Sequence, residues 1–138
     1  MPEPLLELRD LCVDYAGPSG PVRAVDRVSL SVDRGEVLGI AGESGCGKST
    51  LAQAVLRILP PPAVITSGSA RFEGRDLFEM SEPELRRVRW KRLSMVFQSA
   101  LDSLSPVLTL GEQIADTLRA HDFAGAFRPR ETGPLAPE

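Results

Sequence analysis

The segment GESGCGKST, residues 42–50, has the residue types and the spacing needed to bind phosphate groups. It fits the pattern G-x-x-x-x-G-K-[ST], with Gly42, Gly47, Lys48 and Ser49 at the fixed positions. Glycines let the backbone fold closely around phosphates, and successive backbone N–H groups then point inward as an anion-binding nest. Lys48 is expected to reach the β- and γ-phosphates, and the Ser49 hydroxyl is expected to ligate Mg²⁺. The sequence therefore predicts a site for a nucleoside triphosphate with its magnesium ion.

The remaining residues of this segment are expected to line the same site. They are Glu43, Ser44, Gly45, Cys46 and Thr50. Cys46 lies close to Lys48 and to the start of a predicted helix, and both features favour a reactive thiol. We expect Cys46 to be alkylated readily and to be protected by bound nucleotide. The alternative is a small residue that merely fits the loop, because the motif leaves this position free.

A strand and a helix must flank such a loop. EVLGIAG, residues 36–42, is almost continuously apolar, which is typical of a buried parallel strand. STLAQAVLRIL, residues 49–59, predicts a helix that starts at about Lys48. Its apolar stripe is Leu51, Ala52, Val55, Leu56 and Leu59. The N-terminus of this helix would then face the phosphates.

Other segments predict further strands and helices. Residues 5–15, 22–32 and 67–74 read as antiparallel strands, with a bulge near Arg9 and Asp10. Residues 93–98 read as a second buried strand, whereas the prolines at 60–62 end the loop helix. The segments SEPE, 81–84, and TLGE, 109–112, are capping boxes that open helices. Residues 121–138 are rich in proline without periodicity, so we predict a disordered tail there.

The composition excludes several classes of protein. A net charge of −3 in 138 residues argues for neither nucleic acid nor membrane binding. No stretch approaches the roughly 18 apolar residues of a membrane span, and the N-terminus does not read as a signal peptide. We therefore expect a cytoplasmic protein. A basic cluster at residues 86–92 could bind nucleic acid, but its spacing with Glu82 and Glu84 favours a solvated helix face.

The wider pattern resembles the ATP-binding subunits of ABC transporters. Tyr15 precedes the loop, and the segments MVFQ and SLSPVLTLGEQI follow it. Together with EGRDLFEMSEPELRRVR, they are similar to the peptide/nickel uptake subfamily over residues 5–118. The resemblance implies an α/β fold of the P-loop NTPase class, with part of a RecA-like core and an antiparallel β subdomain. Residues 1–120 would then be the N-terminal part of a nucleotide-binding domain.

The resemblance assigns roles to two more residues. Tyr15 matches the aromatic residue that stacks on adenine, and the alternative is an ordinary strand aromatic. Gln98 matches the glutamine that helps to ligate Mg²⁺ and senses the γ-phosphate, and the alternative is a polar strand end. The chain departs from the family pattern with Ser99 and Ala100 after this glutamine and Ser105 before Pro106.

Three family motifs are not found in the sequence. They are the LSGGQ-type signature, the Walker B strand ending in Asp-Glu, and the switch histidine. The chain therefore resembles a domain truncated before these elements, and whether it is an enzyme stays open. We expect weak ATP binding and negligible hydrolysis, since loss of a general base alone commonly costs ~10²–10⁴ in rate. We also expect an unpaired apolar strand edge that promotes aggregation.

The resemblance implies an ATP-binding component of an importer, which couples ATP binding and hydrolysis to uptake of peptides or a related solute. Its implied partners are the transporter's membrane subunits and a second nucleotide-binding subunit, identical or not. It would lie in the cytoplasm at the inner face of the membrane, without inserting into it and without binding nucleic acid. The alternatives are an inactive fragment or interaction module, and an ABC-type ATPase outside transport.

Overall fold

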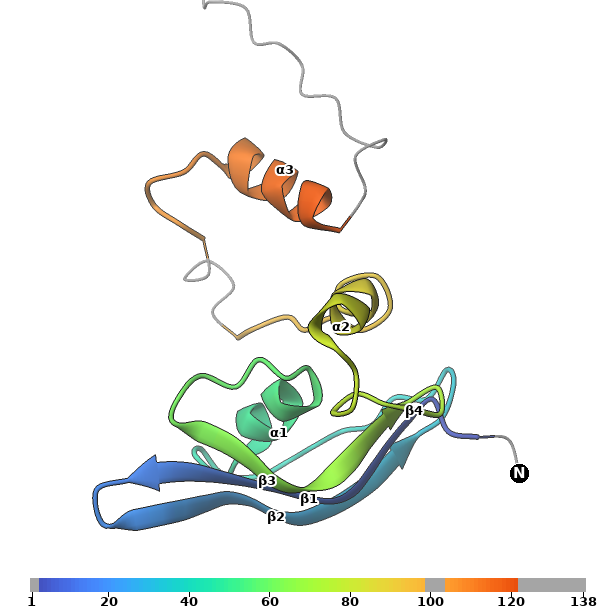
Figure 1. Ribbon diagram of the computed structural model, residues 1–138, viewed down its shortest axis with the longest axis vertical. Coiled ribbons are helices and arrows are strands. Elements are labelled where there is room, and N and C mark those ends of the chain that lie inside the picture. Colours follow the sequence, from blue (N-terminus) through green and yellow to red (C-terminus); the bar gives the residue numbers. More distant parts are fainter. Residues whose placement is uncertain (1–2, 99–103, 122–138) are drawn as a thin grey trace, which may run out of the picture. The chain divides into compact units, whose positions relative to one another are not determined.

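The computed structural model describes residues 3–98 and 104–121, which divide into two compact units between Leu85 and Arg86. In chain order the elements are β1 (Leu6–Gly17), β2 (Gly20–Val32), α1 (Lys48–Val55), β3 (Ala63–Phe72), β4 (Arg75–Asp76), α2 (Glu82–Val88) and α3 (Leu110–Ala120) (Figure 1). Of the predicted tail at residues 121–138, only His121 is described, as the C-cap of α3. Residues 122–138, and Ser99 and Ala100, lie outside the described residues.

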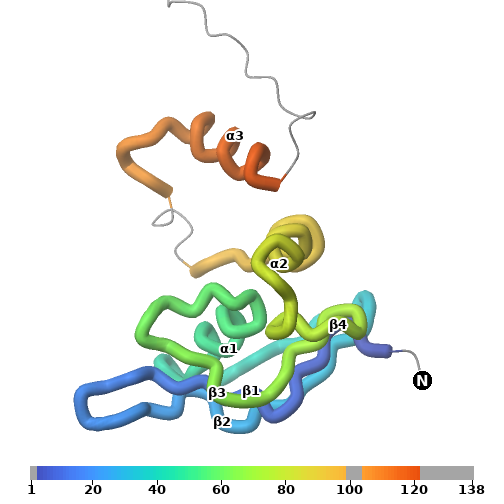
Figure 2. The backbone as a smooth tube through the Cα atoms, in the orientation of Figure 1, coloured from blue at the N-terminus to red at the C-terminus, as the bar shows by residue number. Residues whose placement is uncertain are grey.

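The first unit is built on an antiparallel sheet of strand order β2-β1-β3-β4, and the tube in Figure 2 follows its path. A tight hairpin turn at Pro18 and Ser19 joins β1 to β2, and Gly17 pairs with Gly20 across it. The three predicted antiparallel strands are confirmed, although β3 begins at Ala63 rather than at Ser67. This sheet carries Tyr15 near the end of β1.

A line of backbone irregularities crosses the sheet. The register of β1 against β2 shifts between Leu8 and Leu11, which confirms the predicted bulge. Asp10 and Arg27 take left-handed φ values of 46° and 47°, and Gly68 on β3 has φ 92°. A Cβ atom at Gly68 would lie 2.5 Å from the Leu11 Cα and 2.6 Å from the Asp10 carbonyl oxygen. Only glycine therefore lets β3 pass this closely over the bulge.

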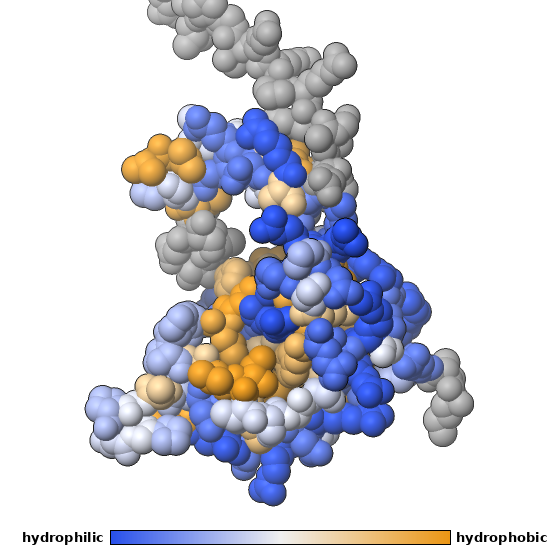
Figure 3. All heavy atoms as spheres, in the orientation of Figure 1, coloured by the Kyte–Doolittle hydropathy of each residue, from blue (hydrophilic) through white to orange (hydrophobic). Residues whose placement is uncertain are grey.

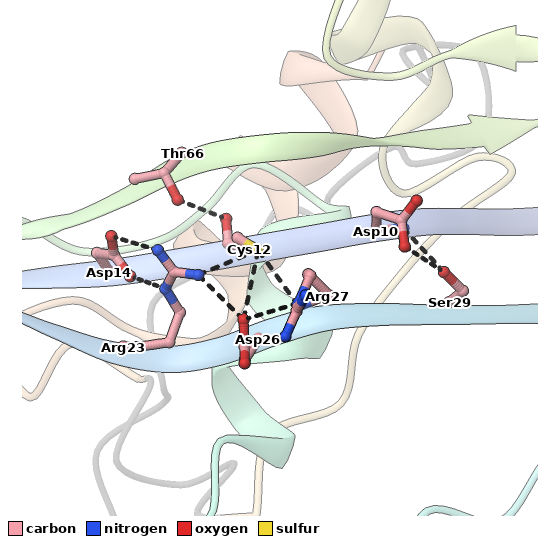
Figure 4. A network of polar contacts seen from close by, with 8 residues as sticks. All are labelled: Asp10, Cys12, Asp14, Arg23, Asp26, Arg27, Ser29 and Thr66. Carbon is pink, nitrogen blue, oxygen red and sulfur yellow. Dashed lines mark hydrogen bonds and ion pairs between the residues drawn. The ribbon is translucent and has the colours of Figure 1, made fainter.

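Ion pairs tie β1 to β2 beside this bulge (Figure 4). The Arg23 guanidinium on β2 donates hydrogen bonds to Asp14 on β1 and to Asp26, and these carboxylates raise its pKa. The buried Cys12 sulfur accepts the Arg27 backbone N–H at 3.2 Å. The network satisfies backbone and side-chain groups at the point where the regular ladder is interrupted.

The core of the first unit lies between the sheet and α1. Leu11, Val13 and Ala54 are fully buried in it, and Ala70 and Leu77 are equally inaccessible. The predicted stripe of α1 is confirmed at Leu51, Val55 and Leu56 but is wrong at Ala52, which is exposed.

The predicted length of this helix is also wrong. α1 ends at Val55 rather than at Leu59, because Arg57 takes a left-handed φ of 52° that a continuing helix cannot adopt. The Arg57 guanidinium then donates to the Met80 carbonyl at 2.7 Å and the Leu77 carbonyl at 3.3 Å. These bonds fix the segment between α1 and the prolines.

The two predicted buried strands are wrong for the described residues. Residues 36–42 form no strand, and Val37, Leu38 and Ile40 are 95%, 43% and 51% exposed. Residues 93–98 contribute only an isolated bridge between Leu93 and Arg89, and Val96 is 87% exposed. A parallel strand needs hydrogen-bonded neighbours. In residues 3–98 and 104–121, neither segment has such neighbours.

The second unit holds α3, whose predicted capping box is confirmed. The Thr109 hydroxyl accepts the Glu112 N–H at 3.2 Å, and the Glu112 carboxylate accepts the Thr109 N–H at 2.8 Å. The Thr109 hydroxyl, at 2.8 Å, and then the Thr109 N–H donate to the Glu112 carboxylate and lower its pKa. The Trp90 ring stacks on His121 with centroids 5.6 Å apart.

The helix at 82–88 straddles the division between the units. Its predicted capping residue Ser81 donates its N–H and hydroxyl to the Glu84 carboxylate at 3.0 and 2.7 Å. The basic cluster only partly lies on this helix, because α2 ends at Val88 and Arg89, Lys91 and Arg92 follow it. The basic residues at 86–92 therefore do not form a single solvated helix face.

The surface of the first unit has an apolar area over α1 and β3 (Figure 3). Exposed apolar side chains in this region include Ile58 and Val64, at 37% and 56%. Among the helices that the structure describes, none has the length and apolar character to cross a lipid bilayer.

Candidate functional site: a phosphate-binding loop at the start of α1

The loop between residues 42 and 50 turns sharply into α1. Gly45 and Gly47 take left-handed φ values of 80° and 96°, which a side chain would resist. Gly47 is the N-cap of α1, and its carbonyl accepts the Leu51 N–H at 2.8 Å. The helix therefore begins at Lys48, as the sequence predicts.

An added side chain at either fixed glycine would meet a close neighbour, which is backbone at Gly47 and a side chain at Gly42. A Cβ atom at Gly47 would lie 2.3 Å from the Ala24 carbonyl oxygen on β2. One at Gly42 would lie 2.7 Å from the Cys46 sulfur. The first contact anchors the loop to the sheet, and the second lets the loop close on itself.

Among the residues that the structure describes, no side chain caps the N-terminus of α1. Gly47 offers no side-chain cap, and the first turn holds no acidic residue. The backbone N–H groups of Lys48, Ser49 and Thr50 precede the first intrahelical bond, so they are available to an anion. This arrangement fits phosphate oxygens.

Lys48 lies folded over the loop. Its ammonium donates to the Gly42 and Glu43 carbonyl oxygens at 2.7 and 2.6 Å, and its Nζ is 3.3 Å from the Cys46 sulfur. The ammonium is thus held at the loop by neutral acceptors, the carbonyl oxygens of residues 42 and 43. Phosphate oxygens are stronger acceptors for an ammonium than carbonyl oxygens, so a polyphosphate can take over these bonds.

Two of the predicted ligands lie together at the first turn of α1. The Tyr15 hydroxyl on β1 and the Thr50 hydroxyl share a hydrogen bond of 3.2 Å. Thr50 is 9% exposed, whereas Ser49 is exposed. The structure therefore places the predicted base-stacking ring next to the predicted phosphate loop.

A pocket of about 290 Å³ adjoins the loop on its β2 side. Its walls are mostly apolar and include Val25, Val28 and Leu30 of β2, with Ile40 and Leu51. Cys46, Gly47 and Lys48 of the loop line the same pocket, but its apolar walls do not suit phosphate groups. It is a gap in the apolar layer, consistent with the exposed, unpaired segment at residues 36–41.

Gln98 is exposed and belongs to the second unit. Its role as a magnesium ligand stays a prediction. Within the described ranges, no cluster of three or more His, Cys, Asp or Glu side chains could hold a metal.

The family described as "ABC transporter" matches residues 25–132. This chain belongs to the ABC transporter family.

The chain is similar to curated ATP-binding proteins of peptide transport. The chain is 47% identical over 118 residues to a probable peptide ABC transporter ATP-binding protein, y4tR, of Sinorhizobium fredii, covering 85% of this chain and 35% of the relative. It is 41% identical over 119 residues to the oligopeptide transport ATP-binding protein OppD of Bacillus subtilis, covering 86% and 33%. The dipeptide transport ATP-binding protein DppD of the same organism is 39% identical over 120 residues, covering 86% and 36%. The chain thus spans about a third of the length of these relatives.

A solved structure shares the fold. It is described as a dimeric, post-hydrolysis state of the ATP-binding cassette MJ0796 bound to ADP and Pi. The TM-score is 0.69 at 23% identity, covering 91% of this chain and 51% of that one. The predicted ABC-type fold is confirmed at this level.

Sequence reasoning missed two supports of the loop. The Ala24 carbonyl behind Gly47 is a backbone group, and no sequence signal marks it. The bond between Tyr15 and Thr50 joins residues 35 positions apart. It could have been suggested only by knowing beforehand that β1 lies beside α1.

Proposed function

We propose that this chain supplies the nucleotide-binding loop of an ABC importer for peptides or a related small solute, and that it binds ATP. The observation that carries the proposal is the loop geometry at α1. Left-handed glycines, an uncapped helix N-terminus and the Lys48 ammonium lie together in residues 42–50. The peptide-transport relatives supply the choice of solute.

Magnesium completes the proposed site. The Ser49 hydroxyl is exposed at the first turn of α1 and would serve as a ligand of an Mg²⁺ that accompanies the nucleotide. Gln98 is proposed as a further oxygen ligand. The metal supplies charge neutralisation on the phosphates.

The chain's residues have distinct roles toward the nucleotide. Lys48 neutralises the terminal phosphates, and the N–H groups of the loop and of α1 orient them. Tyr15 stacks on the adenine. Glu43, Ser44 and Gly45 contribute backbone contacts.

The proposed partners are the transporter's membrane subunits and a second nucleotide-binding subunit. The relatives' names place them in peptide transport, and the structural neighbour is a dimer. The corresponding location is the cytoplasm, at the inner face of the cell membrane. ATP binding and hydrolysis by the assembled transporter would drive solute uptake.

Cys46 offers a direct test of nucleotide binding. Cys46 is exposed and Cys12 is buried, so a thiol reagent should label Cys46 alone in the folded protein. We expect MgATP to slow this labelling at least about fivefold, because the loop closes over the phosphates. Measurement is by mass spectrometry of the labelled peptide.

The matched control is Lys48→Met, which keeps the thiol but removes the ammonium. Labelling of this variant should be insensitive to MgATP. Equal labelling of the wild-type chain with and without MgATP would contradict the proposal.

A further inference from the structure

We propose that Thr50 is a positioning residue for base recognition: its hydroxyl holds the Tyr15 ring in the orientation in which the ring stacks on the base of the nucleotide. The inference rests on the nucleotide binding proposed above and deepens it. It assigns to Thr50 a role that the phosphate-binding motif does not require, since the motif fixes only Gly42, Gly47, Lys48 and Ser49.

The first argument is geometric. The Tyr15 and Thr50 hydroxyl oxygens are 3.2 Å apart, and Thr50 is 9% exposed. A buried hydroxyl needs a partner, because an unpaired one carries the full cost of desolvation. The Thr50 side chain is therefore directed to β1, while its backbone N–H stays available at the helix N-terminus.

The second argument concerns the ring itself. Tyr15 pairs with Val22 on β2 and with Ala63 on β3, and neither side chain can hydrogen-bond the phenol. Within the described residues, Thr50 is the side-chain partner of the Tyr15 hydroxyl. Stacking on a base depends on the plane of the ring, and fixing that plane before binding reduces the entropy lost on binding.

The third argument is where the bond lies. It joins the end of β1 to the first turn of α1, the two elements that carry the base platform and the phosphate loop. The bond therefore sets the position of the ring relative to the phosphates. The bond should therefore strengthen the binding of a ligand that has both a base and phosphates, and it should not strengthen the binding of a ligand of phosphates alone.

The test compares two ligands, ATP and inorganic tripolyphosphate, each with Mg²⁺, by isothermal titration calorimetry. We expect Thr50→Val and Tyr15→Phe each to weaken ATP binding about three- to tenfold, the range for loss of one neutral hydrogen bond. Tripolyphosphate affinity should not change. Thr50→Ser should retain wild-type ATP affinity, and the double variant should be no weaker than either single variant.

A spectroscopic readout needs no ligand. Tyr15 is the chain's single tyrosine, so the tyrosine Raman doublet reports its hydroxyl alone. Thr50→Val should change the doublet ratio, and Thr50→Ser should restore it.

Several results would overturn the inference. One is an equal loss of tripolyphosphate and ATP affinity in Thr50→Val, which would mean that the hydroxyl serves the phosphates. Another is an unchanged ATP affinity in Tyr15→Phe or an unchanged doublet in Thr50→Val. A wild-type chain that binds neither ligand would instead contradict the proposed nucleotide site, while the Raman comparison would still decide whether Thr50 fixes Tyr15.

Discussion

Gly47 shows how one residue joins the loop to the sheet. Its φ of 96° and the 2.3 Å approach of an added Cβ to the Ala24 carbonyl both exclude a side chain. Gly45 has a similar φ of 80°, but no atom lies within 4 Å of an added Cβ. The two glycines therefore differ in packing and share a backbone conformation.

This difference predicts unequal effects of the same substitution. Gly47→Ala should weaken MgATP binding by at least about tenfold, because the carbonyl or the loop must move. Gly45→Ala bears only the left-handed strain, roughly 1 kcal/mol, and should have a smaller effect. Titration calorimetry on both variants checks the order. Equal losses would show that the Ala24 contact does not matter.

Glu84 is a second residue whose environment makes a prediction. The Ser81 hydroxyl, then the Ser81 N–H, then Arg75 donate to its carboxylate and lower its pKa from 4.5 to about 2. Because the folded pKa is the lower one, its stabilising contribution is full above about pH 4.5 and is lost as the pH falls toward 2.

A carbon-detected NMR titration of Glu84 measures this directly. The midpoint should lie well below 4.5 in the wild-type chain and should rise in Ser81→Ala, which removes the hydroxyl that donates to the carboxylate. A wild-type midpoint near 4.5 would contradict the capping arrangement.

At the scale of elements, the bulged sheet is the framework of the site. β1 carries Tyr15, and the Ala24 carbonyl of β2 backs the loop. β3 crosses β1 at Gly68, close to the bulge at Asp10. The shape of the sheet thus depends on a glycine far from the phosphates.

Gly68→Ala should therefore destabilise the first unit by at least about 2 kcal/mol, since the Cβ would meet backbone atoms at 2.5 Å and the φ of 92° disfavours a side chain. Gly111→Ala on α3 is the matched control. It has nothing within 4 Å of an added Cβ and should be neutral or stabilising. Urea unfolding measures the free energy of unfolding of both variants. An unchanged value in Gly68→Ala would show that β3 can shift to make room for the side chain.

The sequence predicted these elements unevenly, for physical reasons. The alternation at Val28, Leu30 and Val32 and the capping box of α3 are local signals, and both are confirmed. The loop motif likewise defined its own turn and the start of α1. Residues 36–42 failed as a strand because apolar composition does not supply the neighbouring strands that parallel pairing needs. The predicted end of α1 was wrong because Arg57 is left-handed, and its guanidinium is held by the distant Leu77 and Met80 carbonyls.

At the scale of the whole molecule, exposed apolar segments are expected to govern behaviour in solution. Val37 and Val96 are 95% and 87% exposed on segments without strand partners in the described ranges. Unpaired backbone beside apolar side chains is a template for association between chains. We therefore expect the chain to self-associate.

Val37→Lys should raise the concentration at which association begins by about tenfold, because a charge opposes strand pairing. Val107→Lys is the control, since Val107 is similarly exposed at 86% but lies near the N-terminus of α3. Sedimentation velocity over a concentration series measures the onset. Equal effects of both variants would point to general solubility instead of the unpaired segment.

The central claim is that the loop at the start of α1 binds MgATP through Lys48. Titration calorimetry of the wild-type chain and of Lys48→Met with MgATP tests it most directly. We predict measurable binding by the wild-type chain and a loss of about tenfold to a hundredfold in the variant, the range for charge-assisted hydrogen bonds to phosphate. Identical affinities for the two chains, or no binding by the wild type, would contradict the account.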